Sequence, residues 1–295
     1  MLELHAVTKR FGKDLAAVDD LSLHLERGVV GLIGHNGAGK STLMQMIATL
    51  SRPTSGRILF DGVDIVARPD AIRARLGYLP QDFGVYPNVS ALEFMQYFAA
   101  LKGVRDGARI ARLLELVNLH EQARRPASSF SGGMLRRLGI AQALLNDPDI
   151  LIVDEPTAGL DPEERLRFRN LLAELGHKKL VMISTHIVSD VESIAARLAI
   201  MRSGRLVACD SPEAILRRAR GQVWSAEVDH GAYADLRDGG GRGGPSIHIL
   251  HAQRHGERVT LRIAHPESPV AGAQLVEPSL EEALMAQRYA VREAA

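Results

Sequence analysis

Stretches of apolar and β-branched residues alternate along the chain with segments whose apolar residues recur every three or four positions. The apolar stretches read VVGLIG from Val29, DILIVDEP from Asp149 and KLVMISTH from Lys179, and helical patterns begin at Ser41 and Pro162. Short buried strands that alternate with helices are typical of an α/β domain with a mostly parallel central sheet. We expect this fold for the main part of the chain.

Two segments depart from this alternation and predict subdomains. LELHAVTKRF (residues 2–11) and DDLSLHLERG (residues 19–28) indicate short antiparallel strands at the N-terminus. Between about residues 85 and 147 the apolar residues have the helical period only, which predicts a helical insert between two strands of the sheet.

A change of pattern after Cys209 predicts a second domain. We expect residues 1–215 to form the main domain and residues 216–295 a small α/β appendage. Just before that boundary, Ser211 and Pro212 stand at the cap and first position of a short helix.

Inside the appendage, QVWSAEV alternates like a strand, and SIHILHA with RVTLRIA predicts a hairpin. The segment Asp238–Pro245 predicts a flexible turn or linker. Ser279 and Glu282 have the spacing of a capping box at the start of a closing helix. Such an appendage covers a sheet edge, contacts a second chain or senses a ligand, and we favour a packing or dimer-contact role.

Composition narrows the class of protein. A hydrophobic content of 46% excludes disorder as a description of the whole chain, and a net charge of +1 gives no reason to expect nucleic acid as a partner. One cysteine cannot form an internal disulfide, and the N-terminus lacks the apolar run of a signal peptide, so we expect a reducing cytoplasm. The apolar runs are shorter than the ~20 residues of a membrane helix. Work at a membrane would need another polypeptide.

A glycine-rich loop between strand VVGLI and the helix from Ser41 fits the pattern G-x-x-x-x-G-K-S. Its backbone N–H groups and the following helix start predict a polyphosphate site, in which Lys40 reaches the β- and γ-phosphates and the Ser41 hydroxyl ligates Mg²⁺. A glycine-rich turn without function is the alternative, but the lysine and both flanking elements favour the phosphate site. The residues expected to contact the polyphosphate here are Gly34, His35, Asn36, Gly37, Ala38, Gly39, Lys40, Ser41 and Thr42.

Two carboxylates end the apolar strand DILIVDEP. Asp154 is placed to hold Mg²⁺, and Glu155 to polarise an attacking water. Acids at a strand end are often only solvated or paired, but the nearby phosphate loop favours the catalytic interpretation.

A second glycine-rich helix start follows in FSGGMLRR. Ser131, Gly132 and Gly133 present free N–H groups, and glycine permits close approach to a phosphate. The alternative is that Ser131 merely caps the helix.

The motifs GHNGAGKST, FSGGM, LIVDEP, GLDP and STH occur in that order, and with them the chain resembles the ATP-binding subunits of ABC transporters over about residues 2–215. The resemblance implies a P-loop NTPase with ATP and Mg²⁺ as cofactors. It also implies that two copies of the chain pair head to tail as a homodimer. Each ATP then lies between the phosphate loop of one chain and Ser131–Gly133 of the other. Phe130 and Met134 depart from the usual leucine and glutamine of that motif.

Further roles follow from the resemblance. His186 is similar to the switch histidine that contacts the γ-phosphate, and Gln81 to the loop glutamine that touches Mg²⁺ and water. Phe11 resembles the aromatic residue that stacks on adenine, although a core aromatic is the alternative. Asp161 lies in the loop that crosses the dimer seam and is also the expected N-cap before Pro162.

The resemblance implies that MgATP closes the dimer, that closure acts on two transmembrane permease subunits, and that hydrolysis reopens it on the cytoplasmic side of the cell membrane. GYLPQDFGVYPNVSALEFM and PSLEEALM resemble subunits of ABC-2-type exporters of drugs, antibiotics or lipid-linked compounds. An importer ATPase is the alternative, as is pairing with a different ATPase. The alternative from another functional class is a soluble ABC ATPase that acts in translation or DNA repair. The single phosphate loop, the near-neutral charge and the lack of a sustained heptad pattern argue against it.

Overall fold

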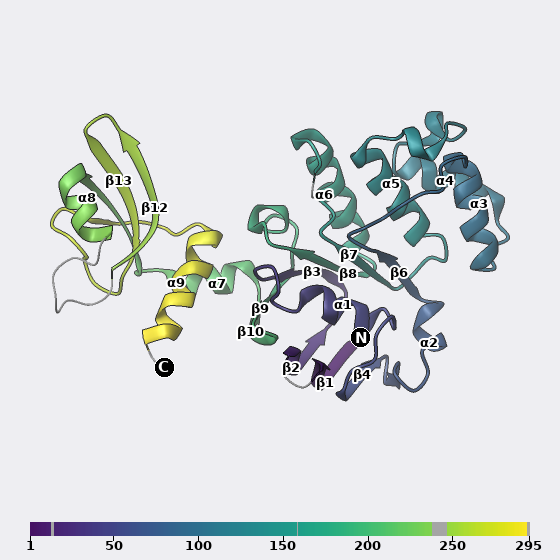
Figure 1. The fold of residues 1–295 in the computed structure, drawn as a ribbon, viewed down its shortest axis with the longest axis horizontal. Helices are drawn as coiled ribbons and strands as arrows, with labels where there is room; N and C mark the ends of the chain where they lie inside the picture. The colour runs from purple at the N-terminus through teal and green to yellow at the C-terminus, as the bar shows by residue number, and fades with distance from the viewer. Residues whose placement is uncertain (13–14, 158, 238–246, 294–295) are drawn as a thin grey trace. The chain divides into compact units, whose positions relative to one another are not determined.

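The computed structural model describes residues 1–12, 15–157, 159–237 and 247–293. The chain divides into two compact units, Met1–Cys209 and Asp210–Ala295 (Figure 1). This boundary lies a few residues before the expected one, because helix α7 (Pro212–Ala219) packs against α9 (Leu280–Glu293) of the second unit. In the part of the chain that the structure describes, no helix has both the length and the apolar composition needed to span a membrane.

The first unit is built on a six-stranded sheet in the order β10-β9-β3-β8-β7-β6. The four pairs from β9 through β3, β8 and β7 to β6 are parallel, which confirms the predicted mostly parallel sheet. Every residue of β7 and β8 is buried, as expected for strands covered on both faces. The strands are β3 (Gly28–Ile33), β6 (Leu76–Leu79), β7 (Ile150–Asp154), β8 (Leu180–Thr185), β9 (Arg197–Arg202) and β10 (Arg205–Asp210).

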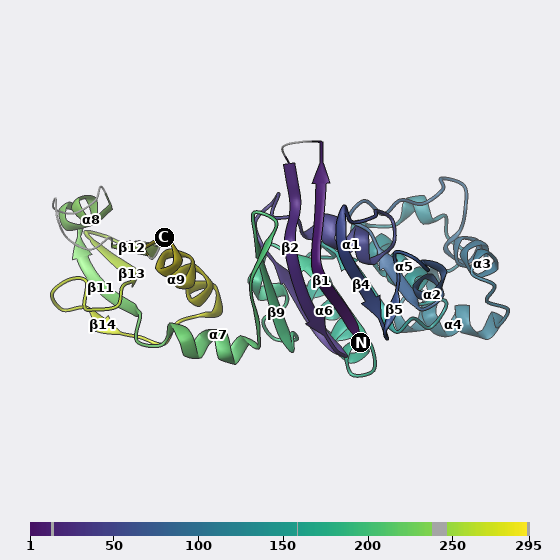
Figure 2. The same ribbon diagram turned by 90° about the horizontal axis from the view of Figure 1, so that it is seen from below.

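The N-terminal strands form a separate antiparallel sheet in the order β2-β1-β4-β5, and Figure 2 shows these strands side by side. One apolar cluster joins this sheet to α1 (Lys40–Ile47) and to the central sheet; it contains Leu4, Leu43 and Leu32. The α1 helix, which begins at the phosphate loop, is therefore held on both sides. The strands are β1 (Leu2–Phe11), β2 (Leu15–Leu25), β4 (Ser55–Phe60) and β5 (Val63–Asp64).

A helical insert separates β6 from β7 and lies at one end of this unit (Figure 1). Its first helix begins with a capping box between Ser90 and Glu93, and its second is capped by Asp106. The insert comprises α3 (Ala91–Leu101), α4 (Gly107–Leu116) and α5 (Gly132–Ala143), with 3₁₀ turns η1 (His120–Gln122) and η2 (Ala127–Ser129). Elsewhere in the unit lie α2 (Asp70–Arg73), α6 (Pro162–Gly176) and η3 (Val188–Asp190).

The second unit is a four-stranded antiparallel sheet, in the order β12-β13-β11-β14, with helices α7, α8 and α9. Its own core includes Val259, Leu261 and Ile263 on β13. The predicted capping box forms at the start of α9, where Glu282 accepts from the Ser279 backbone N–H at 2.8 Å. The strands and remaining helix are β11 (Val223–Asp229), β12 (His248–His255), β13 (Arg258–Ala264), β14 (Gln274–Leu275) and α8 (His230–Arg237). The predicted linker at 238–245 falls outside the described residues.

Candidate functional site

A pocket of about 750 Å³ opens beside the phosphate loop of the first unit. It gathers side chains from the end of β1, the loop before α1, the loop after β6 and the end of β7. Four of its lining residues, Leu15, Ala16, Ala17 and Ser203, carried no sequence signal. The candidate residues that line it are Phe11, His35, Asn36, Gly37, Gly39, Lys40, Ser41, Thr42, Gln81 and Glu155.

Lys40 begins α1 and is the buried cation of this pocket. Its Nζ donates to the carbonyl oxygens of Gly34 at 2.7 Å and His35 at 3.3 Å, so the ammonium lies inside the curl of the loop. Burial lowers the pKa of Lys40, while the nearby charges of Glu155 and Asp154 oppose that shift. A cation held inside a ring of backbone amides is suited to bind a polyphosphate.

Gly39 is a position of the loop where a side chain does not fit. Its φ of 99° lies in the left-handed region, and a Cβ there would overlap the carbonyl oxygen of Ala17 on β2. Ala38 beside it is completely buried, and it anchors the loop in the apolar core rather than facing the pocket.

The two carboxylates at the end of β7 differ in environment. Asp154 is buried and accepts a hydrogen bond from the Ser184 hydroxyl on β8. Glu155 has a φ of 45°, which is uncommon for a residue with a side chain. Its backbone N–H donates to the Ser184 carbonyl at 3.2 Å and hydroxyl at 3.1 Å, and these contacts hold the turned backbone.

Side chains from two other strand ends meet the Glu155 carboxylate. His186 Nδ1, just after β8, lies 3.2 Å from Oε1, and Gln81 Nε2, just after β6, lies 3.5 Å from Oε2. The carboxyl ends of parallel strands thus bring together three of the candidate residues that are far apart in sequence. Such an arrangement can orient a water molecule and accept its proton.

The second glycine-rich start lies outside this pocket. Ser131 caps α5, since its hydroxyl accepts from the Met134 backbone N–H at 3.2 Å, and both Ser131 and Gly132 are exposed. Phe130, at the position of the family's leucine, is buried in the insert. Ser131 therefore does cap the helix, as the alternative interpretation expects. The start of the helix is nevertheless exposed, so a ligand or partner can still reach it.

Gly133 is buried for a reason that the sequence did not reveal. A Cβ there would overlap the Glu164 carboxylate, which comes from the first turn of α6. Glu164 Oε1 lies 3.3 Å from Arg137 Nη2, and the two side chains are only 20% and 15% exposed. An ion pair thus joins α5 to α6, the helix that Asp161 caps.

Asp161 and Phe11 are exposed, which a residue needs in order to contact a ligand or a partner chain. Asp161 caps α6 by accepting from the Glu164 backbone N–H at 2.8 Å. Phe11 is 48% exposed at the pocket rim, with Lys9 Nζ 5.1 Å from the ring centre. Phe11 is therefore not a core aromatic.

The donor set beside the pocket fits Mg²⁺. Ser41, Gln81 and Asp154 offer a hydroxyl, an amide oxygen and a carboxylate, which are hard oxygen ligands. Among the described residues, His, Cys, Asp and Glu side chains form no cluster of three able to hold a metal alone.

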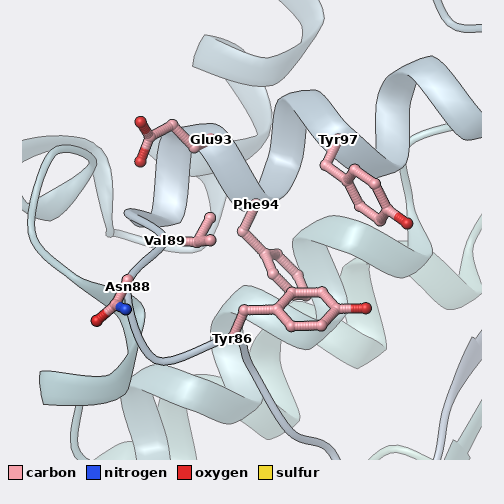
Figure 3. A pocket seen from close by; sticks show the side chains of 6 residues that line it. All are labelled: Tyr86, Asn88, Val89, Glu93, Phe94 and Tyr97. Atoms are coloured by element: carbon pink, nitrogen blue, oxygen red, sulfur yellow. The ribbon is translucent and has the colours of Figure 1, made fainter.

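A second pocket, of about 560 Å³, lies on the helical insert and was not anticipated from the sequence. Figure 3 shows the rings of Tyr86, Phe94 and Tyr97 around it, with Glu93 at its edge. Tyr86 is 56% and Tyr97 50% exposed. Phe94 packs edge to face on Phe83, with ring centres 5.8 Å apart. Phe83 lies two residues after Gln81, so this pocket contacts the loop that carries Gln81.

Residues 18–158 match the model of the family described as ABC transporter. The chain is 39% identical over 223 residues to the Nod factor export ATP-binding protein I of Paraburkholderia xenovorans, spanning 73% of this chain and 72% of that protein. It is 38% identical over 221 residues to the methionine import ATP-binding protein MetN of Corynebacterium efficiens, spanning 70% and 61%.

Among solved structures, the dimeric post-hydrolysis state of the ATP-binding cassette MJ0796 with ADP and Pi superposes with a TM-score of 0.65 and 27% identity. The match covers 72% of this chain and 98% of that one. The chain therefore belongs to the ABC transporter family, as an ATP-binding subunit with the P-loop NTPase fold. It binds and hydrolyses ATP.

Proposed function

We propose that this chain powers the export of a drug, an antibiotic or a lipid-linked compound through two transmembrane permease subunits, to which it is held on the cytoplasmic side of the cell membrane. The observation that carries the proposal is the exposed aromatic pocket of the insert, joined to the Gln81 loop by the contact of Phe83 with Phe94. Similarity to a Nod factor export protein supports this direction of transport.

The chemistry of hydrolysis is assigned to three side chains. Lys40 binds the β- and γ-phosphates. The carbonyl oxygens of the loop hold its buried ammonium in place for this contact. Glu155 orients the attacking water and accepts its proton, and His186 steadies the γ-phosphate and Glu155. Phe11 stacks on the adenine at the exposed pocket rim.

Mg²⁺ is proposed as the metal of this site. Ser41, Gln81 and Asp154 would hold it directly or through water, and its charge would neutralise the phosphate oxygens during transfer. The phosphate loop contacts would come from the backbone of Gly34–Gly39 and the side chain of Thr42.

A second copy of the chain is the proposed partner for the exposed helix start of α5. Ser131 and Gly132 are exposed outside the chain's own pocket and can receive the nucleotide of another chain, whereas Gly133 beside them is buried. ATP has the γ-phosphate needed to reach this helix start, and ADP lacks it. Asp161 would lie at the same seam. Binding of ATP would close the pair, and hydrolysis would reopen it.

The permease subunits are proposed to dock at the aromatic pocket. Its exposed Tyr86 and Tyr97 rings and the Glu93 carboxylate fit a segment with an apolar and a cationic side chain. A side chain inserted there touches Phe94, and through Phe83 its position bears on the Gln81 loop. Docking and hydrolysis are thereby joined through two packed rings.

The test is recovery of partners from native, detergent-solubilised membranes by tagged Glu155→Gln protein with MgATP. We expect mass spectrometry to identify a polytopic membrane protein, and the Tyr86→Ala and Tyr97→Ala changes to abolish its recovery. Leu116→Ala, an exposed apolar residue on α4 outside the pocket, is the matched control.

Other outcomes of this experiment count against the proposal. Recovery of the membrane protein by both tyrosine variants would remove the pocket as the docking site. Recovery of ribosomes or nucleic acid instead would favour a soluble ABC ATPase. Import is the second candidate, because the similarity to MetN is nearly as high as that to the export protein. Transport assays in vesicles of each orientation distinguish import from export.

A further inference from the structure

One face of α5 lies directly on β6 and on the loop that follows it. A Cβ on Gly139 would lie 2.5 Å from the Leu79 side chain, and a Cβ on Gly77 would lie 2.5 Å from the carbonyl oxygen of Ala143. Gly139 and Ala143 are one helical turn apart, so two successive turns of α5 approach the strand closely. The helix cannot shift along β6 without opening these contacts.

Arg136 continues this face one turn nearer the start of α5. Its Nη1 donates to the Pro80 carbonyl oxygen at 3.0 Å, and Pro80 directly precedes Gln81. The guanidinium is partly buried, and Asp82, Asp154 and Glu155 attract its charge. Burial lowers the pKa of Arg136, and the three carboxylates oppose that shift.

The two ends of this contact belong to different nucleotide sites in a head-to-tail pair. Arg136 is five residues from Ser131, or about 7.5 Å along the helix axis. Gln81 contacts the Glu155 carboxylate. A displacement at the helix start, where a partner's nucleotide would bind, is therefore transmitted to the group that faces the chain's own nucleotide.

We propose that Arg136 is a positioning residue for ATP hydrolysis, which holds Gln81 against Glu155 and ties that position to the Ser131 end of α5. The inference rests on the proposed roles of Gln81, Glu155 and Ser131. A planar guanidinium suits this task because its fixed donors can hold a backbone carbonyl while the charge faces the carboxylates. Arg136 does not touch the reacting atoms.

The test compares Arg136→Met and Arg136→Lys with Arg112→Met in the full-length chain. Arg112 is a matched control, since it belongs to the same insert, is 61% exposed and forms an ion pair with the surface residue Asp106. We expect kcat to fall about tenfold or more in Arg136→Met, because a small misplacement of a catalytic group can cost up to about 10²-fold. We expect the dissociation constant for ATP to change less than about twofold. Arg136→Lys should recover part of the rate.

Hydrogen exchange gives a second measurement that does not need turnover. In the Glu155→Gln background, MgATP should protect the amides around Gln81 from exchange, and this protection should be lost with Arg136→Met and kept with Arg112→Met. Equal protection in both double variants, or an unchanged kcat in Arg136→Met, would overturn the inference.

The site assignments are tested separately in the same series. If Gln81→Ala and Glu155→Gln hydrolyse ATP at the wild-type rate, the proposed roles of those residues are wrong. If they lose activity while Arg136→Met keeps it, only the role of Arg136 is wrong.

Discussion

Alanine in place of Gly133 should destabilise the first unit, whereas alanine in place of Gly132 should not. The two glycines are neighbours at the start of α5, but only Gly133 lies against the carboxylate of Glu164. A Cβ at Gly133 must displace that carboxylate, and displacement separates it from Arg137. At Gly132 nothing lies within 4 Å of an added Cβ.

The magnitude follows from the ion pair. Removing one partner of a fully buried pair costs about 3–5 kcal/mol. Here the Glu164 side chain is flexible, both partners keep some exposure, and Arg137 retains hydrogen bonds to the carbonyls of Val117 and Asn118. We therefore expect Gly133→Ala to lower the free energy of unfolding by about 1–2 kcal/mol. For a unit of this size, that is a fall of about 2–8 °C in the unfolding midpoint. For Gly132→Ala we expect a change within about 0.5 kcal/mol.

Scanning calorimetry of the nucleotide-free protein measures these midpoints. Trp224, the single tryptophan of the chain, lies in the second unit, and its fluorescence reports unfolding there as an internal control. Only the transition of the first unit should move. In a Glu164→Ala background, Gly133→Ala should cost less than about 0.5 kcal/mol, because the overlapping atoms are gone.

Two results would refute this reasoning. One is an equal loss of stability in Gly132→Ala and Gly133→Ala. The other is strict additivity of Gly133→Ala and Glu164→Ala, since neighbouring groups that share one interaction cannot be additive.

Three further predictions concern other parts of the chain. Burial lowers the pKa of Lys102 to about 8, whereas the unfolded chain holds that proton up to about pH 10.4. The wild type should therefore gain stability over Lys102→Met as pH rises from 8 to 10, on the order of 1 kcal/mol by chemical denaturation. Glu282→Ala removes the partner of Arg262 at 2.6 Å and should lower the midpoint seen by Trp224 fluorescence without changing ATP hydrolysis. Gly39→Ala should abolish binding of a fluorescent ATP analogue, because its Cβ overlaps the β2 backbone; unaltered binding would contradict the assigned fit of the loop.

The parts of the candidate site that could be predicted from the sequence are those formed by residues adjacent in the chain. The loop from Gly34 to Ser41 is read from its own glycines and the strand and helix beside it, and the structure has these elements in that order. Asp154 and Glu155 were likewise identified from the buried strand that precedes them. Local backbone geometry decides both features, so one segment of sequence is enough to recognise them.

Contacts between distant segments could not be predicted in this way. Arg137 and Glu164 are 27 residues apart, and Arg136 and Pro80 are 56 apart. Helical periodicity shows which face of α5 is polar or small, but not which loop that face meets. The division of the chain after Cys209, a few residues before the expected boundary, has the same origin, because the contact between α7 and α9 is not written in either segment.

The aromatic pocket is a further case. Periodicity along the insert gives no sign that Tyr86 and Tyr97 line a pocket. Both are half exposed, and their rings meet edge to face at 6.2 Å beside the pocket that Phe94 also lines. The number of core positions available on a helix depends on its neighbours, which the sequence of one segment does not contain.

The central claim, that the two phosphate-binding helix starts of one chain serve two different nucleotides, is tested most directly by sedimentation of Glu155→Gln protein. With MgATP and without a membrane partner, the account predicts twice the monomer mass at micromolar concentration, and monomer with MgADP. Ser131→Arg on the same background should remain monomeric with MgATP while still binding ATP in its own pocket. A Glu155→Gln protein that stays monomeric with saturating MgATP would contradict the account.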